Sequence, residues 1–239
     1  MNSKILRISL FVFLFLFFPI ILKGKNKLLY VGDSLFKEQK YYDAKKYYDS
    51  LFYNKNMFSY SMLIKMSFIE ESLGNFEKSI YYLSFYKKRK ENNEVDNSLQ
   101  KIIDDNNIKS FEKSDFNFFE NKFLIYKNYI IYSLLFISIL IFSYNSYRVF
   151  KKRKINYVKS FFLINTLLLF ILNFTNNSIG IVSNNNTFIM HNPSSGSDVY
   201  DIINKGEKLD ITGQTDVWYE IKIDNKKRYI RKKNLLKIN

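Results

Sequence analysis

Residues 148–159 read RVFKKRKINYVK, and this short basic stretch separates two apolar stretches of the chain. Six of its twelve residues are Lys or Arg, and none is acidic. Such a tract indicates either a surface that binds nucleic acid or a cytoplasmic loop between two membrane helices. The sequence on both sides decides between these two alternatives.

The flanking apolar stretches favour the membrane loop. On the N-terminal side, residues 128–147 are uncharged, which is enough for a helix about 30 Å long, the thickness of a bilayer core. On the C-terminal side, a strongly apolar run covers residues 161–174 and is interrupted by Asn165. The sequence therefore predicts a transmembrane helical hairpin, with helices at 126–148 and 158–175 and a basic cytoplasmic loop at 149–157.

The net charge of +15 is distributed as this topology requires. The basic stretch alone contributes +6, whereas residues 25–115 have sixteen basic against fourteen acidic residues. A nucleic-acid-binding domain carries its positive charge across its own surface, in step with the phosphates. We therefore exclude nucleic acid as the partner. The predicted topology anchors on the cytoplasmic side are Lys151, Lys152, Arg153 and Lys154.

The N-terminus has the composition of an export signal. Lys4 and Arg7 precede an uncharged stretch that ends at Leu22, and no small-x-small cleavage site follows. Residues 1–24 are predicted to be a signal peptide or, if retained, an N-terminal membrane anchor. In both cases the chain begins outside the cytoplasm at residue 25. The hairpin then crosses the bacterial inner membrane inward and outward again. The two polar regions, 25–115 and 180–239, therefore both face the periplasm.

Composition argues against an enzyme, here a cell-wall amidase or hydrolase. Cysteine is absent, and His191 is the single histidine of the 239 residues. This excludes thiolate nucleophiles, and one histidine cannot form a three-ligand zinc site without carboxylates. No Gly-rich phosphate loop occurs in the sequence. We therefore predict no catalytic, cofactor-binding or metal-binding residue, and a solvent-facing or packing role for His191.

Residues 28–52 resemble the tetratricopeptide repeat, which places small residues where its two helices cross and large apolar residues around them. The same scheme returns thirty-five residues later, where Ser67 and Ser79 take the small positions and Gly74 forms the turn. Gln39 replaces that turn glycine in the first copy, and Glu70 takes a place that is normally apolar. The packing residues of both copies are predicted to be Gly32, Leu35, Ala44, Tyr48, Gly74 and Ser79.

These repeats predict an all-α domain at 25–115, with residues 94–107 as a polar capping helix. An unrelated four-helix bundle is the alternative. Two pairs are fewer than the three repeats that usually stand alone, so the signal-peptide end or a partner protein is expected to complete the core. Candidate recognition residues on the helices are Tyr47, Tyr48, Tyr81 and Tyr82, although packing between helices is the expected role of most of them.

Residues 180–239 change character and predict an all-β domain of about five strands. Short alternating runs at 187–190, 208–212, 218–223 and 228–232 are separated by turn-forming residues, among them Gly206 and Gly213. The order of a Gly-led strand, a Trp-x-x-Ile pair and an Asp-Asn turn resembles the bacterial SH3-like barrel. The candidate groove or core residues of this barrel are Trp218, Tyr219 and Tyr229.

The order of these parts resembles the BatE family of bacterial aerotolerance operons. The stretch PSSGSD at 193–198, followed by VYDIINKG, is similar to a segment of that family. The resemblance implies a membrane-tethered interaction protein associated with oxidative-stress tolerance. It also implies partners with von Willebrand factor A domains and a MoxR-type ATPase. The alternative reading is a membrane protein that binds peptidoglycan through its SH3-like module.

Overall fold

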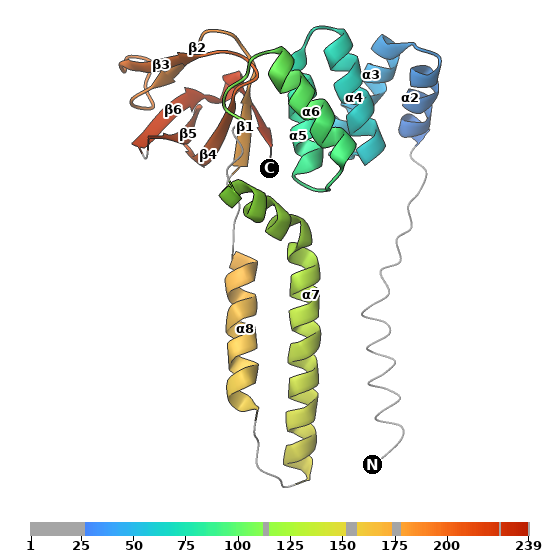
Figure 1. Ribbon diagram of the computed structural model, residues 1–239, viewed down its shortest axis with the longest axis vertical. Coiled ribbons are helices and arrows are strands. Elements are labelled where there is room, and N and C mark those ends of the chain that lie inside the picture. The colour runs from blue at the N-terminus through green and yellow to red at the C-terminus, as the bar shows by residue number, and fades with distance from the viewer. Residues whose placement is uncertain (1–26, 112–114, 152–156, 174–177, 225, 239) are drawn as a thin grey trace. The chain divides into compact units, whose positions relative to one another are not determined.

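The computed structural model describes residues 27–111, 115–151, 157–173, 178–224 and 226–238, and of 115–121 and 124 it describes the backbone alone. The predicted export signal and three topology anchors, Lys152, Arg153 and Lys154, lie outside the described residues. Across the described part, seven α-helices are followed by a seven-stranded antiparallel sheet (Figure 1). The predicted order, helices followed by a β-domain, is confirmed.

The chain divides into two compact units, the first ending at Met57 and the second beginning at Phe58. The first unit contains α2 (Lys27–Lys37), α3 (Tyr41–Asp49) and one π-helical turn, η1 (Ser50–Asn54). Helix α2 packs against α3. The helical pair predicted at 28–52 is therefore present, and its membership of the tetratricopeptide family stays a prediction.

The second unit begins with three more helices, α4 (Tyr60–Ser72), α5 (Phe76–Lys87) and α6 (Asn93–Asp105). Helix α5 packs against both α4 and α6. Ser59 begins α4, because its side-chain oxygen accepts the N–H of Met62 at 3.1 Å. Asn92 begins α6 in the same way and accepts the N–H of Glu94 at 2.8 Å. Helix α6 lies at the position predicted for a polar capping helix, 94–107, and its role as a cap stays a prediction.

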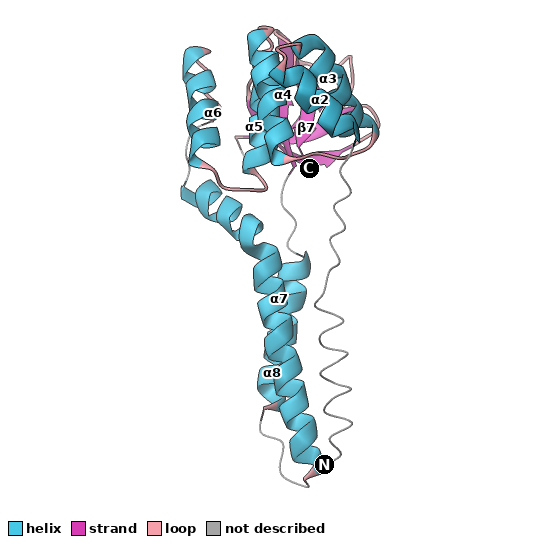
Figure 2. Ribbon diagram, turned by 90° about the vertical axis from the view of Figure 1, so that its right-hand side faces the viewer, coloured by secondary structure: helices cyan, strands magenta, loops and turns pink. Residues whose placement is uncertain are grey.

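Two helices follow, α7 (Asp115–Phe150) and α8 (Val158–Asn173), and they pack against each other; they lie next to each other in Figure 1 and overlap in Figure 2. Within the described residues, Ile125–Phe150 is the one helix long and apolar enough to cross a membrane by length and composition. The described α8 has 16 residues. A helix of that length spans about 24 Å, less than the roughly 30 Å of a bilayer core. Length and composition thus support the span predicted at 126–148. The length of α8 does not support the span predicted at 158–175.

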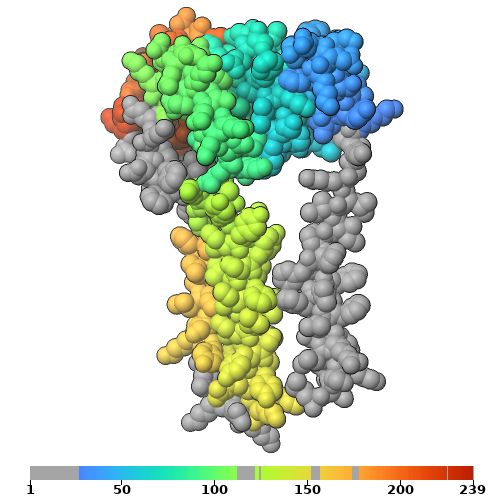
Figure 3. Space-filling model, turned by 45° about the vertical axis from the view of Figure 1, so that its right-hand side comes forward, coloured from blue at the N-terminus to red at the C-terminus, as the bar shows by residue number. Residues whose placement is uncertain are grey.

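Helices α7 and α8 are joined by a polar contact in the middle of their apolar surfaces. Asn165 Nδ2 donates to Ser138 Oγ at 3.0 Å and to the carbonyl of Phe161 at 2.8 Å. Asn165 is the residue that interrupts the apolar run in the sequence. Its amide is satisfied inside the pair, which removes the cost of an unpaired polar group among apolar side chains. Large apolar residues of both helices are exposed, such as Phe142 at 60% and Leu163 at 70%, and Figure 3 shows the exposed side of α7.

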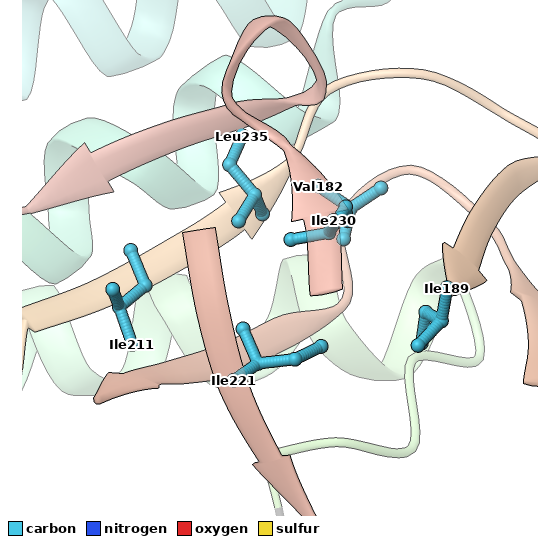
Figure 4. Packing of buried hydrophobic residues seen from close by; sticks show 6 residues of the cluster. All are labelled: Val182, Ile189, Ile211, Ile221, Ile230 and Leu235. Carbon is cyan, nitrogen blue, oxygen red and sulfur yellow. The ribbon is translucent and has the colours of Figure 1, made fainter. Parts of the chain in front are cut away.

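The β-domain is a single antiparallel sheet in the order β3-β2-β6-β5-β4-β1-β7, so β3 and β7 are its edges. Its strands are β1 (Ser178–Val182), β2 (Thr187–Met190), β3 (Val199–Ile203), β4 (Lys208–Gln214), β5 (Trp218–Ile223), β6 (Lys226–Arg231) and β7 (Leu235–Ile238). Closure of this sheet into an SH3-like barrel stays a prediction. One face of the sheet forms the core, a cluster of branched apolar residues (Figure 4): Val182, Ile189, Ile211, Ile221, Ile230 and Leu235.

The four strands predicted from alternation are confirmed as β2, β4, β5 and β6. The sequence predicted about five strands, whereas the described sheet has seven, and β1, β3 and β7 were not located from the sequence. The turn predicted at Gly213 is wrong, because Gly213 lies inside β4, where the pairing with β5 shifts register after Ile211. Glycine inside a strand is typical of such a bulge. The turn predicted at Gly206 is confirmed, and Gly206 has a φ of +91°.

Candidate functional site: the helix crossings and the docked β-domain

The packing residues predicted for the first helical pair come together where α2 crosses α3. A Cβ placed on Gly32 would lie 2.8 Å from Cε1 of Tyr48, so only glycine permits this approach. Ala44 and Tyr48 are fully buried, and Leu35 is half-buried. The Tyr48 hydroxyl donates to Asp33 Oδ1 at 2.8 Å. Burial raises the pKa of Tyr48, and this hydrogen bond raises it further.

In the second helical pair, two serines take the positions that Gly32 and Ala44 have in the first, and they hydrogen-bond each other. Ser67 and Ser79 are both buried, and their hydroxyl oxygens lie 2.7 Å apart. Glu70, which takes an apolar place in the repeat, is also buried, and its Oε2 accepts the side-chain N–H of Asn75 at 2.8 Å. Gly74 forms the turn between these helices with a φ of +78°. The predicted small positions of both pairs are therefore close-crossing positions.

Most of the tyrosines considered as recognition residues are buried in the helical part of the chain. Tyr48, Tyr81 and Tyr82 are buried and Tyr47 is half-buried. Helix α4 instead exposes Ile64 and Phe68, whose exposed fractions are 41% and 46%. These two residues were missed. Their spacing of four, which places both on one side of a helix, is the signal that could have identified them.

The turn between β3 and β4 docks on the ends of α5 and α6. A Cβ placed on Gly206 would lie 2.8 Å from Cδ1 of Ile108 and 2.9 Å from Cε2 of Phe76. The turn thus approaches the helices too closely for a side chain at this position. Gly206 was predicted as part of the SH3-like pattern. The docked position supplies an additional reason for glycine there.

Charged and polar groups surround this contact. Lys205 Nζ lies 3.4 Å from Oε2 of Glu77, whose side chain is 8% exposed, and 4.4 Å from the ring centroid of Phe76. The backbone N–H of Ser110 donates to Glu207 Oε2 at 3.1 Å. In return, Ser110 Oγ accepts the backbone N–H of Lys208 at 2.6 Å. These reciprocal bonds fix the turn against the segment that follows α6.

The edge strand β7 is the second part of this contact. Helix α5 packs against β1 and β7. Lys88, near the end of α5, donates through Nζ to the carbonyl of Ile238 at 3.4 Å. One edge of the sheet is thereby covered by a helix, which is a common way of protecting unpaired strand amides. The β-domain and helices α4–α6 therefore form one body within the second unit.

The SH3-like candidates do not form a single exposed groove. Trp218 is 6% exposed and does not belong to the core cluster. The guanidinium of Arg231 lies 5.3 Å from its ring, and Arg231 also donates to Ser195 Oγ in the PSSGSD loop. Tyr219 packs against the core cluster, and Tyr229 is half-buried. Trp218 is therefore covered from the outer side of the sheet rather than held in the core.

His191 is exposed and lies edge-on to Tyr200, with ring centroids 5.5 Å apart. The Tyr200 ring makes a second contact, with the guanidinium of Arg228, which lies 4.3 Å from the ring centroid. The Tyr200 hydroxyl donates to Asp224 Oδ2 at 2.7 Å, and this bond raises the pKa of Tyr200. Among the described residues, no group of three His, Asp or Glu side chains could hold a metal ion. The arrangement is that of a polar surface cluster.

No protein-family model matches this chain, and no curated protein matches it either.

Proposed function

We propose that this chain is a membrane-anchored scaffold that holds partner proteins at the outer face of a bacterial inner membrane. Its binding parts are helices α2–α6 and the β-domain. The resemblance to the BatE family suggests the partners: membrane proteins with von Willebrand factor A domains and a MoxR-type ATPase system. The observation that carries the proposal is the contact of α5 and the segment after α6 with the β-domain. These parts come before α7 and after α8 in the sequence, and they are joined by hydrogen bonds and an ion pair.

The contact supports a chain that returns to the side from which it entered. Ser110 precedes α7 and Lys208 follows α8, yet their atoms are hydrogen-bonded. A single crossing by α7 would put the two residues on opposite sides of the bilayer. We therefore propose that α8 crosses as well, with the bond between Asn165 and Ser138 holding it against α7. A short helix is accommodated by local thinning of the bilayer or by extended lysines at its ends.

The outward side follows from the charge pattern. Lys151 is exposed at the end of α7, and the basic stretch that it opens belongs to the side where positive residues collect. The helices and the β-domain then face the periplasm. The exposed Ile64 and Phe68 of α4 support a protein partner. Cell-wall binding through an aromatic groove is less favoured because Trp218 is covered. We assign the chain no reaction of its own.

The topology is tested with single cysteines, since the native chain has none. Three exposed positions are suitable: Ser98 on α6, Asp216 in the β-domain and Lys151 beyond α7. Cysteines at Ser98 and Asp216 should react with a membrane-impermeant thiol reagent applied from outside, and one at Lys151 should react only after permeabilisation. Different sidedness for Ser98 and Asp216 would contradict the returning chain.

The scaffold role is tested by cross-linking the tagged full-length chain in its native membranes and identifying the proteins captured. Replacing both Ile64 and Phe68 with Ser should reduce capture of at least one partner. The matched control replaces Ser61, an exposed polar residue of α4, with Ala. A capture pattern no different from membranes without the tagged chain would contradict the scaffold proposal. His191→Ala, tested in cells, should leave function intact.

A further inference from the structure

The two edges of the sheet are treated differently. Edge strand β7 is covered by α5, whereas β3 pairs with β2 alone in the described sheet. An edge strand presents unpaired N–H and C=O groups that can pair with another extended chain. Strand β3 has no proline and no lysine, two residues that commonly block such pairing. The register shift in its pairing with β2 lies before Asp201, and Asp201, Ile202 and Ile203 pair regularly. The backbone of this edge is therefore available for strand addition.

The hydrogen bonds of β3 identify which amide faces outward. Phe188 and Ile202 lie opposite each other, beyond the register shift between Ile189 and Met190. In an antiparallel ladder the N–H groups of alternate residues point away from the partner strand. The N–H of Ile202 is one of these, because it donates to Asp201 Oδ1 at 2.8 Å. That bond to a neighbouring exposed side chain can be exchanged for a bond to an incoming strand.

Side chains along the edge specify the incoming strand. Phe188 and Ile202 form an apolar pair on the outer face, and each is 52% exposed. Asp201 is an exposed carboxylate on the alternate position of β3, and Asp198 lies just before the strand. A third carboxylate, Asp224, is held beside β3 by the Tyr200 hydroxyl. Arg228, packed over Tyr200, and His191 are the basic groups nearby.

A second copy of this chain is a poor occupant. An antiparallel pair of β3 strands centred on Asp201, the middle residue, would place two carboxylates directly opposite each other. Like charges in that position are destabilising. A strand that alternates apolar and basic residues avoids this conflict. Its apolar residues extend the Phe188–Ile202 pair, and its lysine or arginine residues face Asp201.

We propose that β3 binds an extended segment of a partner protein by strand addition, and that this segment alternates apolar with basic residues. The inference rests on the proposed scaffold function and names the chemistry of one partner contact. It can fail while the scaffold proposal stands, because its test uses the purified chain and a synthetic peptide.

The test uses the full-length chain in phosphatidylcholine nanodiscs, whose lipid carries no net charge. The probe is a fluorescent, end-capped peptide of alternating Lys and Val, and fluorescence anisotropy measures its binding. Hydrogen exchange should slow in the segment that contains β3 when the peptide is added. The control peptide has the same side chains but N-methylated backbone amides, so it cannot pair with an edge strand.

Two variants separate backbone pairing from charge. Ile202→Pro removes the outward N–H but no ladder bond, and it should weaken peptide binding about tenfold or more, equivalent to about 1.4 kcal/mol. Asp201→Lys should reverse the preference, so that a Glu-Val peptide binds better than the Lys-Val peptide. Thermal unfolding of both variants checks that the β-domain is folded, and Asp201→Lys provides the test if Ile202→Pro does not fold.

The proposal is overturned if the Lys-Val peptide does not bind, or if the N-methylated peptide binds as well. Slower hydrogen exchange that is confined to segments other than β3 would also overturn the proposal. Self-association of the chain that increases in Asp201→Asn would identify a second copy as the occupant instead.

Discussion

The two helical pairs, α2–α3 and α4–α5, bring their helices together by different chemistry. In the first pair the contact is apolar: Gly32 leaves room for the ring of Tyr48, and Ala44 is fully buried. In the second pair, buried Ser67 and Ser79 occupy the corresponding places and hydrogen-bond each other. The two pairs share a spacing in the sequence because both need small side chains at the crossing. The spacing does not determine whether the contact is apolar or polar.

Their turns differ in a similar way. Gly74 and Gln39 occupy corresponding positions thirty-five residues apart, and both have a positive φ, +78° and +61°. Glycine adopts this conformation readily, whereas other residues adopt it at a cost of about 1–2 kcal/mol. The first pair therefore keeps the turn geometry in spite of its side chain. The difference predicts which of the two pairs tolerates which substitution.

The largest effect is expected at the apolar crossing. Ala44→Leu adds three carbon atoms at a fully buried position of the first helical pair and should destabilise the first unit by about 2–3 kcal/mol. Thermal unfolding of the full chain, followed by a probe in residues 27–57, measures this. Ala44→Ser should be far milder. Equal tolerance of Leu and Ser would mean that Ala44 is not a crossing residue.

A smaller effect is expected at the polar crossing. Ser79→Ala leaves the buried Ser67 hydroxyl without its partner and should cost about 1–2 kcal/mol in urea unfolding. Replacing both serines with Ala removes the orphaned hydroxyl, so the double variant should lose less than the two single losses added together. Strict additivity would contradict a hydrogen bond between the two side chains.

The turns should respond in opposite directions and by about 1 kcal/mol each. Gln39→Gly relieves the left-handed backbone and should raise the midpoint of thermal unfolding. Gly74→Ala should lower it. No atom lies within 4 Å of a Cβ placed on Gly74, so this loss is conformational alone. A stabilised Gly74→Ala would show that the backbone leaves the positive φ region in solution.

The smallest effect concerns the ion pair at the first turn. Glu38 Oε2 lies 2.8 Å from Lys40 Nζ, and this hydrogen bond lowers the pKa of Glu38. A carboxyl with a lowered pKa contributes stability above its unfolded pKa and loses it as the pH falls through the folded pKa. Lys40→Gln should therefore raise the pKa of Glu38 towards its ordinary value in an NMR titration. An unchanged pKa would exclude the pair in solution.

Much of the secondary structure follows from the sequence for local reasons. Helical spacing and small residues locate the helices up to α6, and alternation locates β2, β4, β5 and β6. Strands β1 and β7 were not predicted because their apolar runs are short, and β1 follows the apolar helix α8 closely in the sequence. Strand β3 was not predicted because apolar and polar residues do not alternate along its five residues, VYDII. The register shift in its pairing with β2 explains that pattern.

The contact between the helices and the β-domain could not be predicted from local patterns. It joins residues nearly a hundred positions apart, such as Ser110 and Lys208. Gly206 did carry a signal, because a glycine in a turn can mark the close approach of another segment. The sequence does not identify that segment, and it does not show that Glu77 becomes buried. The sequence predicted that the signal-peptide end or a partner protein completes the helical core, and it did not predict the β-domain that packs against α5 in the second unit.

The central claim, that α4–α6 and the β-domain dock on one side of the membrane, is tested most directly by a disulfide. Ser110 Oγ lies 2.6 Å from the backbone nitrogen of Lys208, and the native chain contains no cysteine. Ser110→Cys combined with Lys208→Cys, oxidised in membranes without detergent, should form an intramolecular disulfide that shifts the mobility of the chain until it is reduced. Each single variant serves as the control. A folded double variant that forms no intramolecular bond, with its two cysteines labelled from opposite sides of the membrane, would contradict the account.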